Sequence, residues 1–119
     1  MTKAERIQKV QKIQQIAEAN PDGFTVHLDT LEHVTNGISF GYAETQNSFG
    51  VEGINHVLDV CEDLLINTIG GWLDDGKYYF DAVRIFPNYE RADAIHFGIL
   101  NRQICGWDIT NNKPVSIPK

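Results

Sequence analysis

The spacing of apolar residues predicts three helices. In residues 3–19 apolar side chains recur every three or four positions, which is the period of an amphipathic helix. A second stripe of this kind covers Val51–Leu65. A third covers Tyr89–Arg102, where Asn88 is placed to act as the N-terminal cap. The predicted inner face of the third helix consists of Tyr89, Ala92, Ile95, His96 and Ile99. Phe97 falls outside this stripe, so we expect it to be exposed.

Between these helices, alternating apolar and polar residues predict short β-strands, because a period of two is typical of a strand with one buried face. These segments are Phe24–Leu28, Gly37–Ala43, Ile104–Ile109 and Val115–Ile117.

The stretch Ile69–Phe86 predicts a β-hairpin at the centre of the fold. The Asp-Gly pair at 75–76 favours a type I′ turn, which requires positive φ at both positions. A turn there places Trp72 opposite Tyr79, a favourable cross-strand aromatic pair. Residues 78–86 carry apolar side chains on both faces, which indicates an interior strand of a sheet that is covered on both sides.

Helices that alternate with pairs of strands, in the order α-ββ-α-ββ-α-ββ, indicate an α+β fold. We expect one mainly antiparallel sheet of about five to six strands, built from successive hairpins, with two or three helices packed on it. No composition shift or linker divides the chain, so residues 1–119 are expected to form a single domain.

Composition and charge place the chain among ordinary globular proteins. It has 119 residues, of which 42% are hydrophobic and 22% are charged. A net charge of −6 at pH 7 weakens any case for binding nucleic-acid phosphates. The N-terminus has no apolar signal region, and no apolar run reaches the roughly 18 residues of a membrane span. We therefore expect a cytoplasmic protein that contacts neither nucleic acid nor membrane.

Residue types that bind metals or perform catalysis show no recognisable spacing. Cys61 and Cys105 are unpaired by spacing and are expected to be free, buried thiols. No cysteine–histidine arrangement has zinc spacing, and none of the four histidines has a nucleophile or carboxylate at a spacing that indicates catalysis. The sequence therefore predicts no catalytic residue, no metal and no cofactor.

Two charged residues stand in the predicted interior strand. Asp81 and Arg84 are three positions apart and so point to opposite faces. A buried charge is either paired or functional. The sequence leaves both readings open, with a structural pairing as the simpler one.

The polar loop Glu44–Gly50 is the main candidate for a binding site. It precedes a helix N-terminus, whose free N–H groups favour anions, and its amide and hydroxyl side chains are neutral hydrogen-bonding groups. The alternative is a polar loop that only caps the helix. The predicted ligand-binding or partner-binding residues are Glu44, Thr45, Gln46, Asn47, Ser48, Trp72 and Arg84.

Three segments carry a resemblance: residues 44–50 (ETQNSFG), residues 70–72 (GGW) and residues 77–81 (KYYFD). With these segments the chain resembles a group of small proteins encoded on bacterial phages, prophages and conjugative elements, notably in gut bacteria. The resemblance covers about residues 13–110. It implies a cytoplasmic accessory protein of a mobile element, and it implies no catalytic role.

Three function hypotheses remain. The first is a non-catalytic interaction module that binds a host or element protein and forms a homo-oligomer, with exposed Phe97 at the oligomer interface. The alternative is a small-ligand binder, possibly for a nucleotide, that uses the loop at 44–50 with Arg84 or Trp72. A small hydrolase or transferase is the third.

Overall fold

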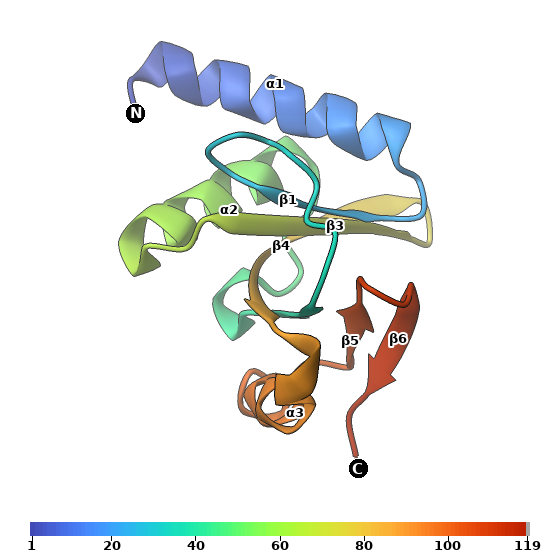
Figure 1. Cartoon of the computed structure of the whole chain (residues 1–119). Coiled ribbons are helices and arrows are strands. Elements are labelled where there is room, and N and C mark those ends of the chain that lie inside the picture. The colour runs from blue at the N-terminus through green and yellow to red at the C-terminus, as the bar shows by residue number, and fades with distance from the viewer. Residues whose placement is uncertain (119) are drawn as a thin grey trace.

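The computed structural model of the chain has three helices and a six-stranded antiparallel sheet (Figure 1). It describes residues 1–118. The strands are β1 (Phe24–His27), β2 (Ile38–Gly41), β3 (Thr68–Asp74), β4 (Lys77–Phe86), β5 (Cys105–Asp108) and β6 (Lys113–Ser116). They lie in the order β1-β3-β4-β2-β5-β6, and every neighbouring pair is antiparallel, which confirms the predicted α+β class.

The helices are α1 (Lys3–Ala19), α2 (Gly50–Leu64) and α3 (Arg91–Leu100), with short 3-10 turns at Ala43–Thr45 and Asn88–Glu90. No helix within residues 1–118 is both long enough and apolar enough to cross a membrane.

The β3–β4 hairpin forms in the predicted register. Trp72 lies opposite Tyr79, and the two rings stack with their centroids 5.1 Å apart. At the turn, φ is 49° for Asp75 and 78° for Gly76, positive at both positions as a type I′ turn requires. Since β4 pairs with β3 on one side and with β2 on the other, it is the interior strand that its sequence predicts.

Gly76→Val is expected to lower the free energy of unfolding by about 1–2 kcal/mol, because a β-branched residue resists the left-handed conformation. A Cβ at position 76 would meet no atom within 4 Å, so the loss would come from the backbone and not from a clash. Asp75→Gly, at the neighbouring positive-φ position, is the control and should be tolerated. Urea unfolding followed by circular dichroism measures both; an unchanged midpoint for Gly76→Val would contradict the turn type.

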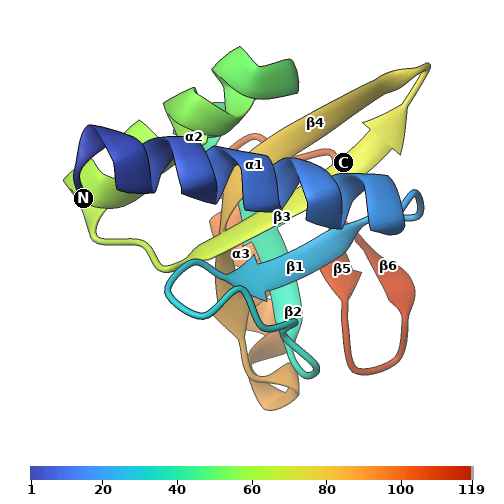
Figure 2. The ribbon, with the colours of Figure 1, turned by 90° about the horizontal axis from the view of Figure 1, so that it is seen from above.

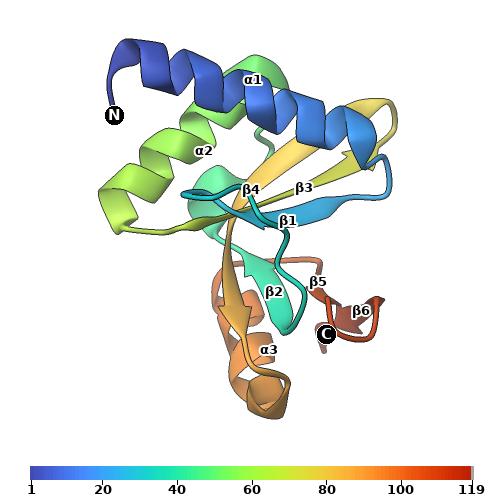
Figure 3. The ribbon, with the colours of Figure 1, turned by 45° about the horizontal axis from the view of Figure 1, so that its top comes forward.

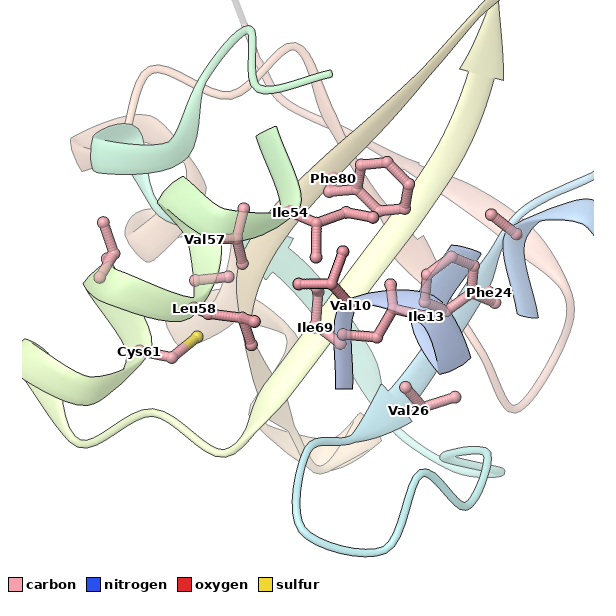
Figure 4. Packing of buried hydrophobic residues seen from close by; sticks show 13 residues of the cluster. Val10, Ile13, Phe24, Val26, Ile54, Val57, Leu58, Cys61, Ile69 and Phe80 are labelled. Atoms are coloured by element: carbon pink, nitrogen blue, oxygen red, sulfur yellow. The ribbon is translucent and has the colours of Figure 1, made fainter. Parts of the chain in front are cut away.

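The larger core lies between two helices and one end of the sheet. α1 and α2 cover β1, β3 and β4 on the same face (Figure 2). Figure 4 shows Ile13 of α1 and Ile54 of α2 near Ile69 of β3, all three fully buried. These apolar stripes at helical spacing explain why α1 and α2 form where the sequence predicts them.

The smaller core lies at the other end of the molecule, where α3 packs on β2 and the end of β4 (Figure 3). Its centre is Phe40 of β2, whose side chain is 1% exposed. A Cβ at Gly98 of α3, or at Gly106 of β5, would lie 2.5 Å from the Phe40 ring. Two glycines therefore leave the space that this ring fills.

The predicted inner face of α3 is wrong except at Ile95, which packs against the smaller core. Tyr89 precedes the helix and is 88% exposed, and His96 is also exposed. Ala94 and Gly98 are the buried residues of α3, and Phe97 packs beside them in the smaller core. The prediction of an exposed Phe97 is therefore also wrong. The cause is that Gly98 has no side chain, so a search for large apolar residues does not find the face on which it lies.

Asn88 does not cap α3, contrary to the prediction. Glu90 occupies the N-cap position, and its side chain makes no cap hydrogen bond. The Asn88 amide Nδ2 donates to Asp108 Oδ1 at 3.1 Å, and the Thr110 hydroxyl donates to Asn88 Oδ1 at 2.6 Å. Asn88 therefore ties the segment before α3 to the end of β5.

The two cysteines differ in exposure. Cys61 of α2 is a buried free thiol, as predicted, and burial raises its pKa to about 11. Cys105 is free but exposed, which corrects the prediction of two buried thiols. Within β5 the buried positions are Gly106 and Asp108, so the alternation of the strand turns Cys105 outward.

Both cores lie on one face of the sheet, and within residues 1–118 no helix covers the other face. Residues paired across strands share a face, and side chains alternate along each strand, so the register identifies residues of this second face. We use the name open face for nine of them: Ser39, Gly41, Gly70, Trp72, Tyr79, Asp81, Val83, Ile85 and Trp107. Ser39, Gly41, Gly70 and Val83 are buried, and the exposed surface of the open face comes mainly from its aromatic residues. The expectation of a sheet covered on both sides is therefore corrected for helices, which pack on one face only.

Candidate functional site

Residues 44–50 connect β2 to α2, and two of their polar side chains are bonded inside the fold. Thr45 is fully buried; its hydroxyl accepts a hydrogen bond from the Ala82 amide at 3.1 Å and lies 3.2 Å from Asp81 Oδ1. Ser48 is buried, and its hydroxyl donates to the Thr45 carbonyl oxygen at 2.8 Å. Thr45 and Ser48 thus hold the loop against β4. This role is structural, but it differs from the predicted alternative of a helix cap, because no side chain makes a cap hydrogen bond at the N-terminus of α2.

The other polar side chains of the loop are exposed. Gln46 Nε2 donates to the carbonyl oxygens of Asn101 and Arg102, just beyond α3, at 3.2 and 3.1 Å. Asn47 adopts a φ of 63°, a conformation that asparagine tolerates better than most residues. Glu44 is exposed as well. The loop therefore keeps fewer free polar groups than its sequence suggests, and its binding role stays a prediction.

The double variant Gln46→Ala with Asn47→Ala is expected to reduce the free energy of unfolding by less than about 1 kcal/mol, because exposed hydrogen bonds contribute little. Binding of the partner or ligand should be lost if these amides recognise it. Thr45→Val, which leaves the buried Ala82 amide without its acceptor, is the comparison and should cost more stability. Thermal denaturation ranks the variants; a strongly destabilised double variant would mean that these amides serve the fold.

A half-buried carboxylate lies on the open face. Asp81 accepts hydrogen bonds from the side chains of Thr45 and Trp72. Burial raises its pKa to about 6, and these two hydrogen bonds oppose the rise. Directly opposite Asp81 on β3 stands Gly70, which leaves one side of the carboxylate without a side chain. The open face thus holds a poorly solvated carboxylate whose pKa lies well above the ordinary value of 3.8.

Asp81 and Arg84 do not pair with each other, and the alternation of β4 places them on opposite faces, as predicted. Among the residues that the structure describes, neither forms an ion pair. The Arg84 guanidinium instead lies 4.6 Å from the ring centroid of Phe86 and 5.6 Å from that of Phe97. The two charges therefore form no ion pair with each other, and a structural and a functional role both stay open for each of them.

Three aromatic rings follow one another beside this carboxylate. Phe49 meets the edge of Tyr79 at a centroid distance of 5.9 Å, and Tyr79 stacks on Trp72. The ammonium of Lys77 lies 4.7 Å from the centroid of the Phe49 ring. Trp72 is 45% exposed, and Trp107, farther along the open face, is 40% exposed. The open face therefore presents large aromatic surfaces to solvent.

A separate cleft of about 690 Å³ opens beside Arg84, where the chain passes from α2 into β3. Its polar lining includes His27, Glu32, His33, Tyr42, Asn67 and Arg84, so one acidic side chain lies in the same cleft as the guanidinium. Burial raises the pKa of the Tyr42 hydroxyl, although the positive charge of Arg84 opposes this shift. A guanidinium among hydrogen-bonding side chains suits a ligand that carries a carboxylate or a phosphate.

Phe97, the predicted oligomer-interface residue, belongs to the smaller core. Its ring meets Tyr42 edge-on at 5.1 Å and contacts Phe86 at 5.5 Å. The argument from an exposed Phe97 to a homo-oligomer therefore loses its premise. Phe97→Ser would disturb packing in the core rather than weaken an interface.

The structure brings some of the predicted site residues together and separates others. Thr45 and Trp72 meet at Asp81, whereas Arg84 points to the other face of β4 and lines the separate cleft. Trp107 and the cleft histidines are not among the predicted residues. The predicted strand Ile104–Ile109 contains Trp107, and a large aromatic residue in a strand is a signal for a contact surface. Which residues lie beside Trp107 depends on the β2–β5 pairing, and the sequence does not reveal that pairing.

The structure within residues 1–118 contains no group of three or more histidine, cysteine or acidic side chains that would hold a metal ion. Comparison of the chain with protein-family models, curated proteins and solved structures finds no match.

Proposed function

We propose that this protein is a non-catalytic binding protein and that it contacts another protein through its open face. The observation that carries the proposal is the exposure of Trp72 and Trp107 on a sheet face that no helix within residues 1–118 covers. Tryptophan and tyrosine are enriched at protein interfaces, and an exposed aromatic surface is stabilised by an apolar partner.

The setting of the proposed function comes from the resemblance to proteins of phages, prophages and conjugative elements. In that setting the protein is a cytoplasmic accessory protein, and its partner is a protein of the host or of the element. A net charge of −6 favours a partner that is not itself acidic.

The test compares three forms of the protein as bait in cell extract: wild type, the double variant Trp72→Ser with Trp107→Ser, and Tyr89→Ser. Tyr89 is 88% exposed but lies beside α3, so its variant controls for the loss of any exposed aromatic residue. We expect wild type and Tyr89→Ser to bind the same protein and the double variant to lose it, with unchanged circular dichroism. Retention by the double variant would refute the open face as the interface.

Light scattering of the same three proteins tests a homo-oligomer. If wild type and Tyr89→Ser are dimers and the double tryptophan variant is a monomer, the open face binds a second copy of the chain. A monomer mass at tens of micromolar would leave a different protein as the partner.

A second candidate function is the binding of a small anionic ligand, possibly a nucleotide, in the cleft beside Arg84. The observation that favours it is the guanidinium of Arg84, which has no acidic partner within residues 1–118, next to two histidines and Tyr42. A thermal-shift screen with nucleotides tests it, since a ligand that binds only the folded state raises the melting temperature. The rise should vanish in Arg84→Gln, and a screen without any rise would refute this candidate.

A further inference from the structure

We infer that the open face receives a cationic side chain, an arginine or a lysine in a basic segment of the partner protein, at the site formed by Trp72, Tyr79 and Asp81. This inference rests on the proposed function and adds the chemistry of the partner. We refer to the three residues as the cation site.

The carboxylate of Asp81 lacks a positive partner of its own. Its hydrogen bonds come from the neutral side chains of Thr45 and Trp72, and the described residues form no ion pair with it. The charged groups that share its face on the hairpin are Asp74 and Lys77, which lie opposite each other next to the turn. A half-buried carboxylate without a counter-ion is stabilised by an incoming cation.

The aromatic rings provide the second part of the cation site. Trp72 and Tyr79 stack with an interplanar angle of 25°, so each ring uses one of its faces in the stack, and Trp72, which is 45% exposed, offers the π-surface that remains accessible to solvent. Tryptophan is the best of the aromatic side chains at attracting a cation to its face. The next ring in the same row, Phe49, already holds the ammonium of Lys77 at 4.7 Å. The chain therefore already contains one contact between a cation and an aromatic ring next to the cation site, on the ring that packs against Tyr79.

A neighbouring amide adds an acceptor to the cation site. A Cβ at Gly41 would lie 3.4 Å from Asp81 Cγ and 2.7 Å from Gln103 Oε1, so the Gln103 amide occupies the space beside Gly41 and close to Asp81. The Gln103 Nε2 donates to the Asn101 carbonyl oxygen, so the Oε1 side of that amide faces Gly41. A carboxylate and an amide oxygen both accept hydrogen bonds, and a guanidinium is a group that only donates. The cation site thus matches arginine better than a neutral or anionic group.

The test uses N-acetyl-arginine amide as the probe and its citrulline analogue as the control, because citrulline has almost the same shape and no charge. Both are titrated into the full chain while the indole N–H resonances of Trp72 and Trp107 are followed by NMR. We expect saturable shifts at Trp72 with the arginine probe only. The same probe should lower the pKa of the Asp81 carboxyl below the value of about 6 that it has in the protein without the probe, because a bound cation favours the charged form.

Three variants make the test specific. Trp72→Ala and Asp81→Asn should each weaken binding of the arginine probe by about tenfold, the scale of a cation–π contact or a charged hydrogen bond. Trp107→Ala, an equally exposed tryptophan on the same face, should change it by less than about twofold. Trp72→Phe, which keeps a ring, should restore part of the affinity lost in Trp72→Ala.

Equal binding of arginine and citrulline, or equal losses in Trp72→Ala and Trp107→Ala, would refute the cation site. If the probe fails while the double tryptophan variant still loses its captured partner, the proposed function stands and the inference alone is wrong. If the probe binds as expected but the double variant retains its partner, the cation site exists and the proposed interface is wrong.

Discussion

Phe40→Ala is expected to lower the free energy of unfolding by about 3–5 kcal/mol, the usual range for a phenylalanine deleted from a core. Phe40 is 1% exposed and is among the largest fully buried side chains of the chain. Gly98 and Gly106 stand against its ring without a Cβ, so neither has a side chain that would fill the space left by the ring. The cavity would therefore stay largely open, which places the loss toward the upper end of the range.

Urea unfolding followed by far-UV circular dichroism measures this loss. Since small domains are stable by about 5–15 kcal/mol, the variant would keep only part of its stability. Tyr89→Ala is the control, because its side chain is 88% exposed and its loss should change stability by less than about 0.5 kcal/mol. A loss below about 1 kcal/mol for Phe40→Ala would contradict the packing of α3 on β2.

A double-mutant comparison tests whether the close contact of Gly98 with the Phe40 ring explains the large loss of stability in Phe40→Ala. Gly98→Ala places a Cβ 2.5 Å from the Phe40 ring in the wild type, where the ring must move. In the Phe40→Ala background that clash is gone, so adding Gly98→Ala should cost less than it does alone. Additive losses would mean that the two positions do not touch.

The parts of the fold that local chemistry determines could be predicted from the sequence. The β3–β4 hairpin follows from an Asp-Gly pair that accepts positive φ, and its register follows from the turn, so the Trp72–Tyr79 pair was predictable. α1 and α2 follow from apolar stripes on otherwise polar helices. In each case the signal lies within one stretch of the chain.

The face of α3 could not be predicted in this way, because its signal lies in another strand. Gly98 belongs to the inner face only because the Phe40 ring needs the space above it, and Phe40 is far away along the chain. A search for large apolar residues at helical spacing does not select glycine as an inner-face residue and selects Ile95, His96 and Ile99 instead. The result is a predicted face rotated away from the real one, with Phe97 wrongly on the outside.

The candidate site shows the same limit. Thr45, Trp72 and Asp81 come from three elements, and they meet only because β4 lies between β3 and the segment that follows β2. Sequence reasoning marked each of them separately: Thr45 as part of a polar loop, Trp72 as an aromatic strand residue and Asp81 as a charge in an interior strand. The order of the strands, which joins them, depends on long-range pairing that has no local signature.

Asp81→Asn is expected to stabilise the protein at pH 7 by up to about 3 kcal/mol. The pKa of Asp81 is raised from an ordinary 3.8 to about 6 in the folded state, and each unit corresponds to about 1.4 kcal/mol. A raised pKa means that the folded state binds the proton more tightly than the unfolded chain. The charged carboxylate therefore destabilises the fold above pH 6, and this penalty disappears as the pH falls through 6 toward 4. Asparagine has nearly the same shape, keeps an oxygen for the Thr45 and Trp72 hydrogen bonds, and carries no charge.

The measurement compares the free energy of unfolding of the wild type and Asp81→Asn at several pH values between 4 and 8. We expect the difference to be largest at pH 7 and above and to shrink to nearly zero at pH 4, which separates it from a change in packing that is independent of pH. Asp75→Asn, an exposed turn position where asparagine also accepts positive φ, is the control and should show no such trend. A destabilised Asp81→Asn at pH 7 would mean that the carboxylate is compensated within the fold. If Asp81→Asn is instead more stable at pH 7 and no longer binds the arginine probe, the charge of Asp81 destabilises the fold and serves binding.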